Sequence, residues 1–190
     1  MGNVILKCTN LSKTYDFDNA LNNVNLSIET GKIIGLLGPN GSGKTTFIKL
    51  LNGLLKPTEG EILINGQNPG VETKKIVSYL PDKNYLDNSK TVKAILQLFA
   101  DFYDDFDLEK AQNMLKDLGI DITRRFKLLS KGMKEKVQLI LVMCRRAKLY
   151  LLDEPIAGVD PAEVQAAVSR DHGWIPFVRS SSLSSELRDH

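Results

Sequence analysis

One eight-residue segment, Gly38 to Thr45, constrains this chain more than any other feature. It reads GPNGSGKT and fits the pattern G-x-x-x-x-G-K-[ST]. A short apolar run at 33–37, of the kind buried on both faces of a parallel sheet, precedes it, and apolar residues at helical spacing follow from Thr45 to Leu54. A strand, a glycine-rich loop and a helix in this order predict a phosphate-binding turn, and make an ordinary surface turn the weaker interpretation.

The residue types of this loop suit the binding of phosphate groups. Glycines let backbone N–H groups converge on an anion, and the start of the following helix adds the positive end of its dipole. We expect Lys44 to reach the β- and γ-phosphates of a nucleotide and the Thr45 hydroxyl to ligate Mg²⁺. The predicted phosphate-binding residues are Gly38, Asn40, Gly41, Ser42, Gly43, Lys44, Thr45 and Thr46.

A second apolar run, 149–152, ends in two carboxylates, Asp153 and Glu154. Ligands of α/β proteins gather at the carboxyl ends of parallel strands, so a metal-bound nucleotide is expected there. One carboxylate would hold the Mg²⁺ shell and the other would polarise an attacking water. Surface acids that simply cap a strand are the competing interpretation, which the phosphate loop makes the minor one.

The remaining regions differ in character. Apolar and polar residues alternate at 4–8 and 24–28 and predict strands near the N-terminus. A turn dipeptide, Asn65-Gly66, follows the segment EILI at 61–64, and a further strand is expected at 76–80. Apolar residues at helical spacing then predict a mostly helical insertion from 83 to about 145.

Composition and charge exclude several classes of protein. The chain has 190 residues with 42% hydrophobic and 25% charged composition, so it can bury a core and is not disordered. The net charge of +2 gives no general basic field, which argues against nucleic acid as a partner. No apolar run approaches the roughly 20 residues of a membrane span. Cys8 and Cys144 lie in apolar stretches, which indicates reduced core thiols and a cytoplasmic setting.

Together these motifs resemble the nucleotide-binding domain of an ATP-binding cassette (ABC) ATPase over residues 4–162. The family's other motifs occur in the family's order: Tyr15 at the position that stacks on adenine, a signature motif LSKGM at 129–133, and a D-loop AGVD at 157–160. The resemblance implies an α/β fold, a P-loop NTPase core with a mainly parallel sheet, an N-terminal antiparallel β subdomain and a helical subdomain. It implies ATP and Mg²⁺ as cofactors.

The resemblance also assigns roles by position. Glu154 would be the general base, and Asp153 the acid of the Mg²⁺ shell. Ser130 and Gly132 would face the γ-phosphate held by a second protomer, because such a site is completed only in a head-to-tail dimer. Asp160 of the D-loop is expected to lie at the same nucleotide.

The implied function is that of an ATP-binding and ATP-hydrolysing subunit that dimerises around Mg-ATP and drives a separate membrane permease. It would be cytoplasmic and peripheral on the inner face of the cell membrane. Four aromatic residues would line a cleft for a permease segment, or are plain core: Phe99, Phe102, Tyr103 and Phe106. The alternatives are a subunit with weak or no hydrolysis and a soluble ABC ATPase of translation or DNA repair. A small P-loop kinase would not explain residues 129–133 or 157–160.

Two departures from the family pattern fall near the site. Lys131 and Met133 replace the commoner Gly and Gln of the signature, which we interpret as subfamily variation. Asp82 stands where the family has a glutamine. A carboxylate there is expected to approach Mg²⁺ or water, and the competing interpretation is a solvated turn after Pro81.

The expected division of the chain has four parts. The β subdomain and phosphate-loop part span 1–82, the helical subdomain with its signature 83–145, the second part of the core 146–162, and an atypical tail 163–190. This tail lacks a clear strand of branched apolar residues, and neither of its histidines, His172 and His190, is in register for the family's switch histidine. A replaced ending, through a frame shift or truncation, is the hypothesis that follows.

Overall fold

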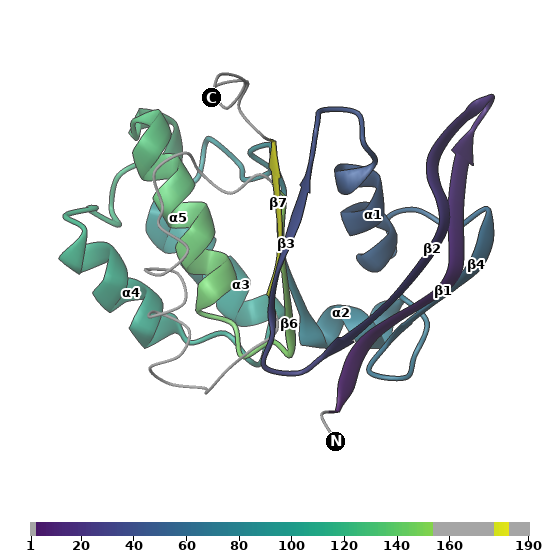
Figure 1. The fold of residues 1–190 in the computed structure, drawn as a ribbon. Helices are drawn as coiled ribbons and strands as arrows, with labels where there is room; N and C mark the ends of the chain where they lie inside the picture. Colours follow the sequence, from purple (N-terminus) through teal and green to yellow (C-terminus); the bar gives the residue numbers. More distant parts are fainter. Residues whose placement is uncertain (1–2, 154–176, 183–190) are drawn as a thin grey trace, which may run out of the picture.

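The computed structural model describes residues 3–153 and 177–182. Its N-terminal part is a three-stranded antiparallel sheet of order β2-β1-β4 (Figure 1). The strands are β1 (Val4–Tyr15), β2 (Asp18–Glu29) and β4 (Glu59–Ile64). The predicted N-terminal strands and the antiparallel β subdomain are therefore confirmed.

The second sheet is parallel and has the order β3-β7-β6-β5. Its strands are β3 (Ile33–Gly38), β7 (Phe177–Ser182), β6 (Leu149–Asp153) and β5 (Val77–Leu80). Because all paired strands run in the same direction, their carboxyl ends meet at one edge of the sheet. That edge carries the loop after β3 and the carboxylate that ends β6.

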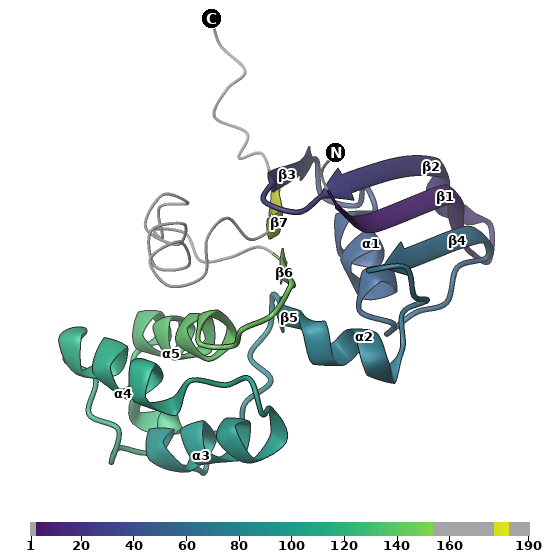
Figure 2. The same cartoon turned by 90° about the horizontal axis from the view of Figure 1, so that it is seen from below.

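Helices lie on both sides of the parallel sheet (Figures 1 and 2). Helix α1 (Lys44–Leu51) lies on the side of the antiparallel sheet, and short α2 (Val71–Ile76) leads into β5. On the other side lie α3 (Val92–Phe102), α4 (Leu108–Asp117), the 3₁₀ turn η1 (Phe126–Leu128) and α5 (Lys131–Met143). Side chains of Thr91, Asp107 and Ser130 cap the starts of α3, α4 and α5, which explains where these helices begin.

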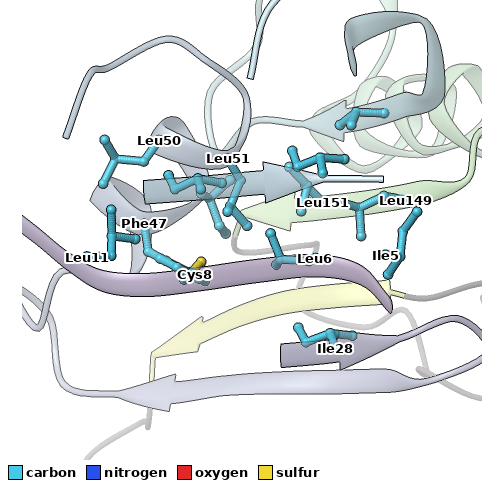
Figure 3. Close-up of a cluster of buried hydrophobic side chains, with 14 residues drawn as sticks. Ile5, Leu6, Cys8, Leu11, Ile28, Phe47, Leu50, Leu51, Leu149 and Leu151 are labelled. Carbon is cyan, nitrogen blue, oxygen red and sulfur yellow. The ribbon is translucent and has the colours of Figure 1, made fainter. Parts of the chain in front are cut away.

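Two main hydrophobic cores hold these layers. In the first, Phe47 and Leu51 of α1 pack between the antiparallel sheet and Leu151 of β6 (Figure 3). The second lies among α3, α4 and α5, and includes Leu96, Leu115 and Leu141. Cys8 and Cys144 are free thiols buried in the first and second core, which confirms the prediction of core cysteines. No helix within the described residues is long and apolar enough to cross a membrane.

The turn at Asn65-Gly66 forms as predicted. Both residues have positive φ, 50° and 77°, and Ile64 and Gln67 exchange two backbone hydrogen bonds of 2.7 and 3.0 Å across them. These are the features of the tight turn that the Asn-Gly dipeptide favours. The prediction of a strand over 76–80 is one residue too long, because Ile76 ends α2.

Two expectations about the parallel sheet are wrong. β3 is an edge strand among the strands described, and Leu37 is 66% exposed, so its apolar run is not buried on both faces. The tail does contain a strand, since 177–182 forms β7 in the interior of the sheet. Pairing with β3 on one edge and β6 on the other satisfies the backbone of β7, so sheet context overrides a weak composition.

Candidate nucleotide-binding site

The phosphate loop folds around the ammonium group of Lys44. Lys44 begins α1, its side chain is almost completely buried, and its Nζ donates hydrogen bonds of 2.8 Å to the carbonyl oxygens of Gly38 and Pro39. The Ser42 amide donates to the Pro39 carbonyl at 3.2 Å and closes the turn. The loop therefore carries a positive charge at the N-terminal end of a helix, which is an arrangement that attracts anions.

Gly43 lets the loop approach the antiparallel sheet closely. It has φ of +86°, and a Cβ built on it would lie 2.2 Å from the carbonyl oxygen of Ala20 in β2. Gly41 has a similar φ of +83°, but a Cβ there would meet nothing within 4 Å. The two glycines therefore share one backbone conformation and differ in the space available to a side chain.

We expect Gly43→Ala to lower the free energy of unfolding more than Gly41→Ala. Both variants carry the roughly 1–2 kcal/mol of a left-handed backbone. Gly43→Ala adds a further loss of about 1–3 kcal/mol, because the backbone of β2 must move away from the new methyl group. Urea denaturation of the two variants measures the difference, and equal losses would contradict the close contact with Ala20.

The end of β6 brings a carboxylate to the start of α1. The Thr45 hydroxyl donates a 3.1 Å hydrogen bond to Oδ1 of Asp153, which is 1% exposed. Hydroxyl and carboxylate oxygens are ligands that Mg²⁺ accepts in nucleotide sites. The predicted pair of Thr45 and Asp153 is thus in contact, and its donor set fits this metal.

Asp82 lies at the same edge of the sheet. Leu80 of β5 pairs with Leu152 of β6, so the residues that follow the two strands lie near each other. Burial, and then the negative charges of Asp153 and Asp82, raise the pKa of Tyr79 to about 12. Tyr79 therefore stays protonated at neutral pH beside two carboxylates.

Tyr15 lies at the end of β1, where the β1–β2 hairpin turns. It pairs with Asp18, and two pairs further Lys13 pairs with Leu21, whose side chain would touch a Cβ on Gly43. The residue is 43% exposed, and the Lys13 ammonium lies 5.2 Å from the centroid of its ring. Tyr15 is thus carried by the hairpin that packs against the phosphate loop, with part of its ring open to a ligand.

The signature residues are not brought to the phosphate loop of the same chain. Ser130 caps α5 by accepting a hydrogen bond of 3.3 Å from the Met133 amide, and Ser130 and Gly132 are exposed. α5 lies across the parallel sheet from α1 (Figures 1 and 2), and the start of α5 is on the same upper side as the phosphate loop in the view of Figure 1. Two further predicted site residues, Glu154 and Asp160, lie outside the described residues, as do His172 and His190.

A cleft of about 500 Å³ lies between the sheet and the helical layer, and most of the residues that line it were not predicted from the sequence. Of the four aromatic residues expected to line such a cleft, Phe99 and Tyr103 do, whereas Phe106 belongs to the helical core and Phe102 does not line it. The cleft also has walls from α1, from β5 and the segment after it, and from the residues that follow α5, including Lys49, Tyr85 and Arg145. No local pattern marks these residues, because they meet only through the fold.

A phosphate loop between β3 and α1, with a carboxylate at the end of another strand of the same parallel sheet, defines a P-loop nucleotide-binding protein. The family model described as ABC transporter matches residues 21–157. The chain therefore belongs to the ABC transporter family, and it is one of the family's ATP-binding subunits, which are ATPases coupled to transport. The predicted family, P-loop fold and nucleotide-binding function are confirmed.

Individual relatives support this assignment. The chain is 35% identical to the SkfA peptide export ATP-binding protein SkfE of Bacillus subtilis (strain 168), over 94% of this chain and 80% of the relative. It is 32% identical to the lipopolysaccharide export system ATP-binding protein LptB of Haemophilus influenzae, over 98% of this chain and 80% of the relative. A solved ATP-binding subunit of an ABC transporter has a TM-score of 0.79 and 28% identity, covering 94% of this chain and 80% of its own.

Proposed function

We propose that this chain binds Mg-ATP at the carboxyl edge of its parallel sheet, pairs head to tail with a second nucleotide-binding subunit, and drives a separate membrane permease. The observation that carries this proposal is the contact of the Thr45 hydroxyl with the buried carboxylate of Asp153. Thr45 directly follows Lys44, whose ammonium group lies in the phosphate loop. That contact places one cation for phosphate beside two oxygens for a metal.

The proposed chemistry divides among five side chains. Lys44 exchanges the neutral carbonyls of Gly38 and Pro39 for charged phosphate oxygens, which are stronger acceptors. Thr45 and Asp153 would hold Mg²⁺, which when bound neutralises developing negative charge on the phosphates. Glu154 would accept the proton of the attacking water. Asp82 would orient this water or approach the metal.

The proposed dimer follows from the position of the signature helix, which lies on the opposite side of the parallel sheet from α1. Since Ser130 begins a helix across the sheet from its own phosphate loop, a second copy turned head to tail is needed to bring a signature helix to that loop. The N-terminal end of α5 then places a second positive dipole end at the γ-phosphate, with Gly132 close by. Asp160 would lie at the same junction, and Tyr15 would stack on the adenine.

The proposed permease contact is the cleft that contains Phe99 and Tyr103. Its aromatic rings offer an apolar surface, and Lys49 and Lys74 add positive charge to its walls. A short amphipathic segment of the permease with an aromatic or aliphatic anchor would suit it. The chain would then be peripheral on the inner face of the membrane and have no nucleic acid partner. We also propose that the chain divides into four parts, with boundaries after residues 82, 145 and 162.

The test is Mg²⁺-dependent ATP hydrolysis by the purified chain over a range of protein concentrations. We expect turnover per chain to rise with concentration below the dimer dissociation constant, because two chains complete each site, and to vanish when EDTA removes the metal. Turnover per chain that is independent of concentration would contradict the dimer. ATP binding without turnover would favour instead a nucleotide-binding subunit with weak or no hydrolysis.

A further inference from the structure

Two adjacent arginines follow helix α5, and the fold treats them differently. The side chain of Arg145 is 4% exposed and that of Arg146 is 63% exposed. The Arg145 guanidinium donates from Nε and Nη2 to the Asp105 carboxylate at 2.9 and 3.1 Å. It also donates from Nη1 to the Val77 carbonyl at 2.8 Å and from Nη2 to the Lys75 carbonyl at 2.7 Å. Arg145 is the one buried arginine among residues 3–153.

These partners belong to three separate parts of the molecule. Asp105 lies in the turn between α3 and α4, and the ring of Tyr103 beside it stacks on the guanidinium, 3.9 Å from its centroid. Lys75 and Val77 lie at the junction of α2 and β5, the strand that leads to Asp82. The Tyr150 hydroxyl of β6 donates to the Arg145 carbonyl. The C-terminal end of α5 is therefore held to the helical layer and to the parallel sheet at one point.

The opposite end of α5 has no comparable attachment to the sheet in the described residues. Helix α5 has 13 residues and so extends about 20 Å at 1.5 Å per residue. A tilt of about 10° around its C-terminal end moves Ser130 at its N-terminal end by roughly 3 Å. A misplacement of about 1 Å can slow an enzymatic step on the order of 100-fold. Small changes around Arg145 are therefore magnified at the signature residues.

We infer that Arg145 is a positioning residue for the ATPase: its guanidinium holds the C-terminal end of α5, and so determines where Ser130 meets the nucleotide bound by the second chain. This inference rests on the proposed dimeric function. The planar guanidinium is required because it donates in several fixed directions at once, to one carboxylate and two carbonyls. A lysine ammonium keeps the charge but cannot span the same partners.

The kinetic test compares Arg145→Gln and Arg145→Lys with Arg146→Gln. Arg146→Gln is the matched control, since its side chain is exposed and makes a 3.5 Å contact with Asp107. We expect kcat to fall by about tenfold or more in both Arg145 variants, while KM for Mg-ATP stays within about twofold, because α1 and the phosphate loop are unchanged. Arg146→Gln is expected to match the wild type in both constants.

A distance measurement separates positioning from general stability. Spin labels on Ser27→Cys in β2 and Lys136→Cys in α5 report the placement of α5, since both positions are exposed and the native cysteines are buried. We expect the distance distribution of the Arg145→Lys protein to broaden by about twofold relative to wild type. Leu115→Ala, which opens a cavity in the helical core, is expected to lower the melting temperature and leave this distribution narrow.

The two measurements distinguish the inference from the function on which it rests. Unchanged kcat in both Arg145 variants, with an unchanged distance distribution, would overturn the positioning role. A wild-type chain that hydrolyses no ATP would contradict the proposed function, and the distance distribution would still decide whether Arg145 holds α5. Should Arg145→Gln not fold, Arg145→Lys carries both tests.

Discussion

Replacing Lys44 by methionine is expected to lower ATP hydrolysis by about 10²- to 10³-fold, the loss that follows removal of one preorganised donor to developing charge. The Kd for Mg-ATP is expected to rise about 10- to 100-fold, since a charge-assisted hydrogen bond contributes roughly 1.5–3 kcal/mol. Methionine keeps the length of the side chain in its buried position. Steady-state hydrolysis and a binding titration with Mg-ATP measure the two effects.

The control for this variant is Lys56→Met, which removes an exposed cation a short distance beyond α1. It is expected to leave hydrolysis and Kd unchanged, because its charge is largely screened in solvent. The Lys44 variant also frees the carbonyls of Gly38 and Pro39, so its melting temperature must be compared with the wild type. A folded Lys44→Met protein with normal hydrolysis would contradict the phosphate-binding role of this lysine.

The sequence predicts those parts of the site that consecutive residues form. The loop around Lys44 needs glycines with positive φ, a cation and a hydroxyl at fixed spacing, and all three requirements are local. The link from Thr45 to Asp153 was predictable for a different reason, because parallel strands present their carboxyl ends at one edge. General rules of sheet topology thus reach across more than a hundred residues of sequence.

Features decided by packing among distant segments were not predictable. Arg145 and Arg146 are adjacent and identical in sequence, yet one is buried between two layers and the other exposed, because only one side of the chain there faces Asp105 and the end of α2. β7 escaped prediction for a related reason. Its serine-rich sequence has low strand preference, and the pairing of its backbone on both edges becomes visible only once β3 and β6 are in place.

Glu154→Gln is the second substitution with a large expected effect. Glutamine keeps the shape of the side chain and its capacity for hydrogen bonds but cannot accept a proton from water. We therefore expect kcat to fall by about 10²- to 10⁴-fold, with Kd for Mg-ATP unchanged within a few-fold. Because the triphosphate then persists, the variant is expected to elute as a dimer in gel filtration with Mg-ATP and as a monomer without it.

Asp82 is the alternative candidate for the general base. By the register of the parallel sheet, Asp82 and Glu154 occupy equivalent sequence positions relative to β5 and β6. Leu80 pairs with Leu152, and Asp82 and Glu154 each follow one of these paired residues by two positions in the sequence. If Glu154 is the base, Asp82→Asn retains most of its hydrolysis and Glu154→Gln does not. The opposite pattern would assign the proton to Asp82 and leave Glu154 without a catalytic role. Glu109→Gln, an exposed position on α4, controls for the loss of one negative charge and is expected to match the wild type.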